Sequence, residues 1–165
     1  MKGDYRGVVG DIGGTNARFA LVEDDGRIRA PRSYACADYA SLSDILAEYL
    51  STVSGRFRPS RAVLAVAGPV KDGEIEFTNL SWVVSELDLV STFGFEAVRL
   101  INDFAAQALA APLMEADDLR VIGPVLPPSL DGAAVILGAG TGFGVAGLAR
   151  TARADVALPA EGGHA

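Results

Sequence analysis

The stretch Gly10-Asp11-Ile12-Gly13-Gly14-Thr15-Asn16 decides how this chain is interpreted, because it lies between two runs that are typical of β-strands. Residues 5–12 have the pattern of a buried strand. Residues 17–23 show the two-residue alternation of side chains that is typical of a strand. Adjacent glycines permit a tight turn in which backbone amides and the Thr15 hydroxyl can face a phosphate, while Asp11 can orient a hydrated Mg²⁺. An ordinary glycine hairpin is the alternative interpretation of the same residues.

A second glycine-rich stretch, Gly138-Ala139-Gly140-Thr141-Gly142-Phe143-Gly144, echoes this arrangement. Apolar runs at residues 133–137 and 144–149 predict another strand, turn and strand, suited to the outer phosphates of a nucleotide. A GxGxxG spacing occurs here, but a strand rather than a helix follows it, and the chain contains no P-loop motif. A glycine-rich loop that serves only close packing remains an alternative.

The segments between the two stretches predict a mixed α/β arrangement. Strands are expected at residues 28–34, 61–67 and 97–101, with an edge strand at 74–78 that pairs back after a turn at 71–73. Helices are expected over residues 42–53, where Ser41 and Asp44 form an approximate capping box, and from Ser85 to Phe93. Three prolines within residues 124–129 indicate a domain junction, so we expect one domain at 1–123 and the start of another at 124–165.

Asn102 and Asp103 occupy the point where a predicted strand runs directly into an Ala-rich helix that ends before Pro112. Active sites form at the carboxyl ends of sheet strands in this order of elements. The Asp103 carboxylate could accept a proton from a hydroxyl, and the Asn102 amide could hold a second hydroxyl. A structural helix cap is the alternative role for this aspartate.

The stretch Glu161-Gly162-Gly163-His164 is the last polar cluster. A carboxylate and an imidazole separated by two glycines can converge on one polyol and distinguish its hydroxyls. The alternative is that both side chains are simply solvated.

Composition excludes several classes of protein. The 165 residues have a formal net charge of −7, which provides no basic footprint for nucleic acid. One cysteine, Cys36, and one histidine, His164, exclude an internal disulfide and a Cys/His zinc cluster. The first ten residues lack the apolar core of a secretory signal, and the uncharged stretch 132–149 is too rich in glycine for a membrane helix. We therefore expect a cytoplasmic protein with neither nucleic-acid nor membrane partners.

These motifs, in this order, resemble those of the bacterial glucokinase family, within the sugar-kinase and actin-like ATPase superfamily. The matching stretches are GDIGGTNARFALV (10–22), AVAGPV (65–70), FTNLSWVVS (77–85), INDFAAQALA (101–110), LGAGTGFGVAGL (137–148) and LPAEGGHA (158–165). The resemblance implies an actin-like, ribonuclease H-like α/β fold. It consists of a mixed five-stranded sheet flanked by helices, plus the opening hairpin of a second, larger α/β domain.

The resemblance also implies roles for individual residues. Asn102 and Asp103 are similar to the sugar-binding and general-base pair, Glu161 and His164 resemble ligands of the sugar hydroxyls, and Asp11 would contact Mg²⁺ through water. The residues that resemble the two phosphate loops for Mg-ATP are Gly10, Asp11, Ile12, Gly13, Gly14, Thr15, Gly138, Gly140, Thr141 and Gly142.

The activity that this resemblance implies is transfer of the ATP γ-phosphoryl group to the 6-hydroxyl of glucose. Family members are about twice as long, so we expect this chain to hold one lobe and the opening of the other, and the full-length protein could form a homodimer. Two alternatives remain open: a non-catalytic sugar- or nucleotide-binding fragment, and a kinase or regulator of the repressor, open-reading-frame and kinase (ROK) type. The Phe104-Ala105-Ala106-Gln107 stretch favours the glucokinase branch over the ROK branch.

Overall fold

The computed structural model describes residues 5–53, 59–123, 132–139 and 143–160. The chain divides into two compact units, Met1–Asp103 and Phe104–Ala165. The predicted junction at 124–129 lies outside the described residues, and the division between the compact units falls before it. Within the described ranges, no helix combines the length and the apolar character needed to cross a bilayer.

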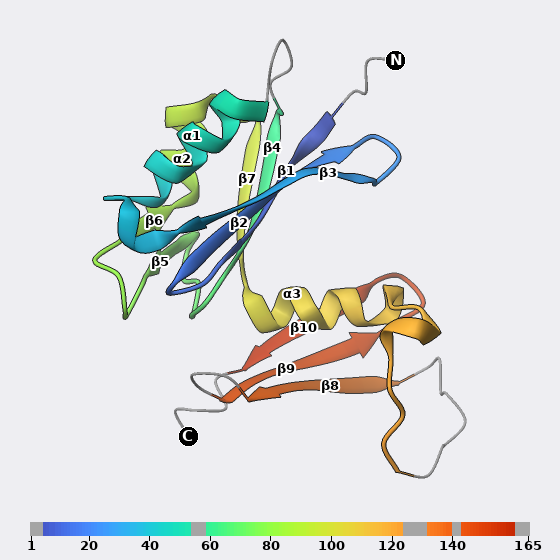
Figure 1. Ribbon diagram of the computed structural model, residues 1–165. Helices are drawn as coiled ribbons and strands as arrows, with labels where there is room; N and C mark the ends of the chain where they lie inside the picture. Colours follow the sequence, from blue (N-terminus) through green and yellow to red (C-terminus); the bar gives the residue numbers. More distant parts are fainter. Residues whose placement is uncertain (1–4, 54–58, 124–131, 140–142, 161–165) are drawn as a thin grey trace. The chain divides into compact units, whose positions relative to one another are not determined.

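The first unit is built on a mixed five-stranded sheet (Figure 1). Its strands are β1 (Tyr5–Ile12), β2 (Asn16–Glu23), β3 (Ile28–Ala35), β4 (Arg61–Val66) and β7 (Ala97–Asn102), in the spatial order β3-β2-β1-β4-β7. The pairs β1–β2 and β2–β3 are antiparallel, whereas β1–β4 and β4–β7 are parallel. The expected sheet and its strands are therefore confirmed, with bounds that differ by at most one residue.

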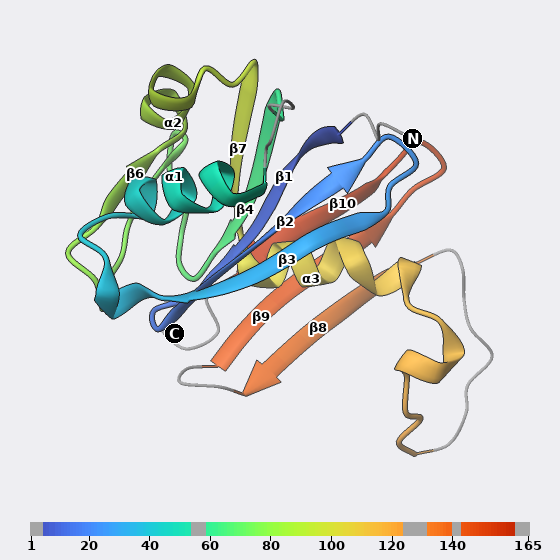
Figure 2. The ribbon, with the colours of Figure 1, turned by 45° about the horizontal axis from the view of Figure 1, so that its top comes forward.

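Two helices, α1 (Leu42–Val53) and α2 (Glu86–Phe93), cover one face of this sheet (Figures 1 and 2). At the start of α1, the Asp44 amide donates to the Ser41 hydroxyl oxygen at 3.2 Å, which confirms Ser41 as the cap. The Asp44 carboxylate accepts from the Ser41 hydroxyl at 2.8 Å, so the predicted capping box is confirmed only in its Ser41 half. Ser85 occupies the cap position of α2, but its side chain makes no capping hydrogen bond. The helices and the sheet share one core, whose largest fully buried side chains include Tyr49, Phe19, Ile12, Leu21, Leu42, Ile45, Leu46, Leu64 and Leu89.

The expected edge strand pairs differently from the prediction. β5 (Glu74–Glu76) does not join the large sheet but pairs antiparallel with β6 (Val83–Ser85) as a two-stranded sheet. The Phe77 amide donates to the Trp82 carbonyl at 3.0 Å, and the two rings meet edge to face at a centroid distance of 6.1 Å. This local aromatic pair closes the hairpin, so the strand finds its partner nearby in the chain.

The second unit contains α3 (Asp103–Ala110, whose first residue belongs to the first unit) and a three-stranded antiparallel sheet. Its strands are β8 (Ala133–Ala139), β9 (Phe143–Arg150) and β10 (Asp155–Ala160), in the order β10-β9-β8. The sequence predicted the β8–β9 hairpin but not β10. β10 contains Pro159, which cannot donate to a ladder and argues against a strand, but an edge strand tolerates it.

Small side chains let α3 approach this sheet closely. Ala108 of α3 and Ala146 of β9 are both fully buried, and Leu148 is 1% exposed. Phe104 and Ile136 pack against this cluster. The helix ends at Ala110, and a short 3₁₀ turn (Ala111–Leu113) follows, in agreement with the helix stop predicted at Pro112.

Candidate functional site

The first glycine turn, between β1 and β2, is fixed by three hydrogen bonds. The Gly13 amide donates to the Asn16 carbonyl at 2.9 Å, and the Cys36 amide donates to the Thr15 carbonyl at 2.8 Å. The Cys36 thiol also donates to the Gly13 carbonyl, with 3.5 Å between the heavy atoms. Cys36 is buried, and this burial raises the pKa of its thiol. The cysteine therefore holds the turn as a neutral hydrogen-bonding group.

The glycines of this motif differ in how much space surrounds them. A Cβ on Gly13 would lie 3.5 Å from the Asn16 carbonyl oxygen, and one on Gly14 would lie 3.6 Å from the Asn79 side chain. A Cβ on Gly10 would lie only 2.8 Å from Leu64 Cδ2. Gly10 thus allows close packing inside the sheet, whereas packing does not require glycine at the turn itself. The phosphate contacts assigned to these positions stay predictions.

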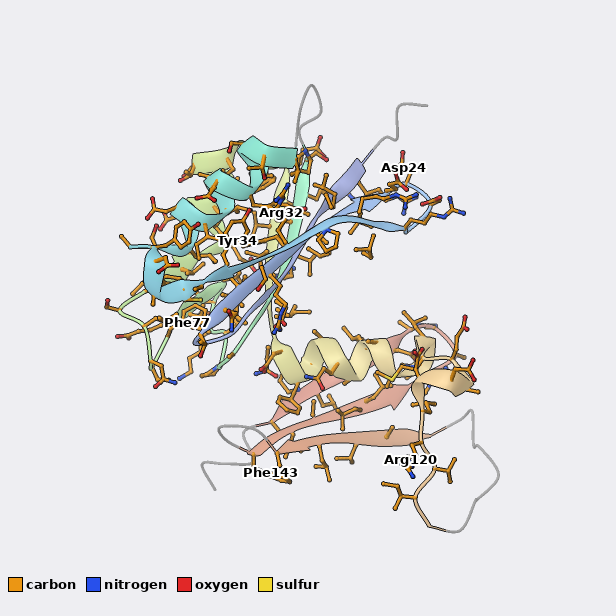
Figure 3. All side chains as sticks on the ribbon, viewed as in Figure 1. Asp24, Arg32, Tyr34, Phe77, Arg120 and Phe143 are labelled. Atoms are coloured by element: carbon orange, nitrogen blue, oxygen red, sulfur yellow. The ribbon has the colours of Figure 1, made fainter. Side chains whose placement is uncertain are left out.

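Asp11 is held by a cross-strand ion pair. It lies opposite Arg18 in the β1–β2 register, and Arg18 Nη1 donates to Asp11 Oδ2 at 2.8 Å. The Asp11 side chain is still 55% exposed. A depression of about 430 Å³ runs along this part of the sheet, and its lining includes Asp11, Arg18 and Arg32 of β3. Figure 3 labels Arg32 on the first unit. Gly13, Gly14 and Thr15 are not among the residues that line the depression, so the depression lies beside the turn.

Three parallel strands end in register at one edge of the large sheet. Ile12 of β1 lies opposite Val66 of β4, and Val66 lies opposite Asn102 of β7. The Ala67 amide, just after β4, donates to the Ile12 carbonyl at 3.0 Å. The first glycine turn and the Asn102–Asp103 pair therefore emerge from the same carboxyl edge, where active sites of open α/β sheets form.

The Asn102 side chain is oriented by the loop that follows β4. Its Nδ2 donates to the Gly68 carbonyl at 3.2 Å. Gly68 has φ 146°, a left-handed backbone conformation that favours glycine, and a Cβ there would meet Ile75 Cδ1 at 3.2 Å. Asp103 follows at once as the first residue of α3. The predicted sugar-binding and general-base pair is thus tied to a defined backbone at the sheet edge.

One polar residue near this edge was not singled out from the sequence. Asn79 is exposed, and its side chain lies beside Gly14 of the first turn. The FTNLSWVVS stretch (77–85) contains this residue, so a signal was present, but its chemistry pointed to no specific role. The structure makes it a further polar group next to the glycine turn.

The second glycine stretch is described only in part. Gly138 and Gly144 are cross-strand partners at the end of the β8–β9 hairpin. Gly140, Thr141 and Gly142 lie outside the described residues, as do Glu161 and His164. The predicted nucleotide and sugar contacts of these five residues therefore stay predictions.

The family model described as Glucokinase matches residues 8–165, which include both glycine stretches and the Asn102–Asp103 pair. The chain belongs to the glucokinase family. This membership, together with the mixed five-stranded sheet and its helical layer, confirms the actin-like α/β fold expected from the sequence.

Individual members of the glucokinase family match nearly the whole chain. A glucokinase of Caulobacter vibrioides is 53% identical over 99% of this chain and 51% of its own length. The crystal structure of a glucokinase from an Antarctic psychrotroph matches with a TM-score of 0.83 at 41% identity, covering 96% of this chain and 50% of that one. That of Balamuthia mandrillaris glucokinase, in complex with glucose, matches with a TM-score of 0.73 at 27% identity, covering 98% and 49%. The chain spans about half the length of the curated relatives it matches.

Proposed function

We propose that this protein transfers the γ-phosphoryl group of ATP to the 6-hydroxyl of glucose, giving glucose 6-phosphate and ADP. The observation that carries the proposal is the in-register ending of β1, β4 and β7, from which the glycine turn and the Asn102–Asp103 pair emerge together. Membership of the glucokinase family supports the same activity, and a related structure contains glucose. The match to the glucokinase model also favours this activity over a ROK-type kinase or regulator.

Asp103 would act as the general base. Phosphoryl transfer depends mainly on positioning and charge neutralisation, so the chain's own groups have limited chemistry to perform. The Asp103 carboxylate accepts the proton of the 6-hydroxyl as that oxygen bonds to the γ-phosphorus and the bond from phosphorus to the bridging oxygen of ADP breaks. Asn102, oriented by the Gly68 carbonyl, would hold a neighbouring hydroxyl of the sugar.

Asp11 is the residue that would face Mg²⁺. Mg²⁺ prefers oxygen ligands and keeps several waters, and the exposed carboxylate of Asp11 fits a contact through water. Arg18 already donates to one carboxylate oxygen of Asp11, which argues against direct coordination of the ion by both oxygens. The ion would neutralise charge on the phosphates during transfer. In this arrangement Asp11 orients the hydrated ion, and Arg18 fixes the direction of Asp11.

The remaining predicted contacts complete the proposal. Amides of Gly13, Gly14 and Thr15 would face one phosphate group and those of the second glycine stretch another. Glu161 and His164 would bind sugar hydroxyls. We also propose a cytoplasmic location and, for the full-length protein, a homodimer.

The experiment that tests the activity replaces Asp103 with Asn. Glucose-dependent ADP release would be measured on this chain and on a fusion that adds the second half of the Caulobacter vibrioides relative. We expect Asp103→Asn to lower turnover by roughly 10²- to 10⁴-fold, the contribution typical of a general base, while glucose binding by calorimetry changes little. Asp117→Asn, on an exposed 3₁₀ turn, is the matched control and should leave turnover unchanged. Turnover that survives Asp103→Asn would rule out this role for Asp103.

A second candidate function is sugar or nucleotide binding without turnover by this chain. It is favoured by the apolar side chains exposed on one face of the small sheet, where Val135, Leu137 and Leu158 are 65%, 60% and 55% exposed. Phe143, at the start of β9, is also half exposed (Figure 3). Binding of glucose or ATP without ADP release by the chain, with ADP release restored in the fusion, would support this candidate.

A further inference from the structure

Phe104 contacts the two outer glycines of the second glycine stretch. It is the second residue of α3, directly after Asp103, and it packs on the β8–β9 hairpin together with Ala108 one turn later. The two glycines beneath its ring are Gly138 and Gly144, which lie opposite each other across the hairpin. All three residues belong to the same compact unit.

The Phe104 ring occupies the space that side chains at these glycines would need. A Cβ on Gly138 would lie 2.7 Å from both Cε1 and Cζ of the ring, and a Cβ on Gly144 would overlap the ring edge. Gly147 on the same strand differs, because a Cβ there would meet Leu158 Cβ at an ordinary 3.4 Å. The outer glycines of the stretch therefore form a seat for one aromatic side chain.

We propose that Phe104 is a positioning residue, whose ring, seated on Gly138 and Gly144, fixes the first turn of α3 and thereby the backbone of Asp103. The catalytic part of this inference rests on the proposed function. Consecutive residues of a helix point in directions about 100° apart, so anchoring Phe104 against the sheet turns the Asp103 side chain to a different side of the helix. The anchor thus sets the direction of the carboxylate without covering it.

The seat is tested by a double-substitution cycle on this chain. Gly144→Ala should lower the midpoint temperature of unfolding by roughly 5 °C, since the new methyl group and the ring compete for one space. In a Phe104→Ala background the same substitution should change the midpoint by less than about 1 °C, because the ring is gone. Gly147→Ala is the control and should be tolerated in both backgrounds. Equal losses from Gly144→Ala in both backgrounds would overturn the seat.

The effect on the first turn is read by hydrogen exchange. In an α-helix the Gln107 amide bonds the carbonyl of Asp103, so its protection reports whether that turn is closed. We expect Phe104→Ala to speed exchange at Gln107 by roughly tenfold, and Phe104→Leu, which keeps an apolar anchor, to have a smaller effect. Exchange unchanged by Phe104→Ala would overturn the positioning role.

The catalytic consequence is measured in the fusion with the second half of the Caulobacter vibrioides relative. Phe104→Ala should lower kcat by roughly tenfold with little change in KM for glucose, as expected when a catalytic group is misplaced. Gly7→Ala, which should destabilise the chain at a site away from the Phe104 ring, is the control and should leave kcat unchanged at a temperature at which every variant is folded. A kcat lowered as much by Gly7→Ala as by Phe104→Ala would show a purely structural role. If the unsubstituted fusion has no turnover, the proposed function fails, while exchange at Gln107 still decides whether Phe104 holds the turn.

Discussion

The two glycine-rich hairpins of this chain look alike in sequence but use their glycines differently. In the β1–β2 hairpin the crowded glycines, Gly7 and Gly10, lie within the strand, and the turn glycines Gly13 and Gly14 have room for a methyl group. In the β8–β9 hairpin the crowded pair, Gly138 and Gly144, lies one residue pair before the ends of the two strands that lead into the turn. Glycine therefore serves close packing in both hairpins, but at different distances from the turn.

The crowding group at Gly7 differs from the groups at Gly138 and Gly144. Gly7 is confined by the Arg61 carbonyl, part of the backbone of the neighbouring strand β4. Gly138 and Gly144 are confined by the side chain of Phe104, which a substitution can remove. The stability lost when a Cβ is added to a glycine therefore depends on whether the obstacle is backbone or a side chain that can move.

The largest effect is expected for Gly7→Ala. Its Cβ would lie 2.6 Å from the Arg61 carbonyl oxygen, and relief would require β1 and β4 to separate. We expect a loss of about 3 kcal/mol in the free energy of unfolding, at the upper end for overpacking. Urea unfolding, followed by far-UV circular dichroism, measures it. A loss below about 1 kcal/mol would show that the sheet backbone moves as easily as a side chain. Backbone and side-chain obstacles would then not differ in their effect on stability.

A smaller effect is expected for Gly10→Ala. The obstacles here are the side chains of Leu64 and Phe19, at 2.8 and 3.0 Å from the added Cβ. Side chains can shift, so we expect a loss of about 1–2 kcal/mol in the same measurement. Trimming Leu64 to Val should reduce the additional cost of Gly10→Ala, because it removes atoms from the crowded space. An unchanged cost in the Leu64→Val background would mean that Leu64 is not the limiting contact.

The smallest effect on stability is expected for Gly14→Ala, which should change the free energy of unfolding by less than about 0.5 kcal/mol. Within the described part of the chain, its Cβ would meet the Asn79 side chain, at 3.6 Å. If the turn amides face a phosphate, the added methyl group should nevertheless weaken ATP binding, measured by calorimetry with and without Mg²⁺. Unchanged ATP affinity would remove the phosphate role from this position and leave an ordinary hairpin turn.

Local patterns predicted most of the fold because their causes are local. The β1–β2 hairpin, the Ser41 cap of α1 and the Pro112 helix stop each depend on residues a few positions apart. β10 was missed because Pro159 is acceptable only on an edge strand, and its place in the sheet cannot be read from its own residues. The pairing of β5 with β6 was missed because β6 is only three residues long, Val83–Ser85, and its own pattern predicted no strand.

The residue types of the candidate site were predictable from the sequence, but the hydrogen bonds that orient them were not. Asn102 and Asp103 stand out as a polar pair between a strand and a helix, yet nothing local indicates that the Gly68 carbonyl orients Asn102. The role of Cys36 in holding Gly13 and Thr15 likewise depends on β3 lying beside β2. Such contacts join residues far apart in the sequence, and only the folded chain brings them together.

The strand order of the large sheet has a consequence for synthesis on the ribosome. β1 is central, β2 and then β3 add on one side, and β4 and then β7 add on the other. Each strand of this sheet therefore leaves the ribosome when the edge it will join has already been made, and no strand has to be inserted between two others. Domains fold as units during translation. A nascent chain that has exposed β7 therefore holds every strand of its first sheet before β8 leaves the ribosome.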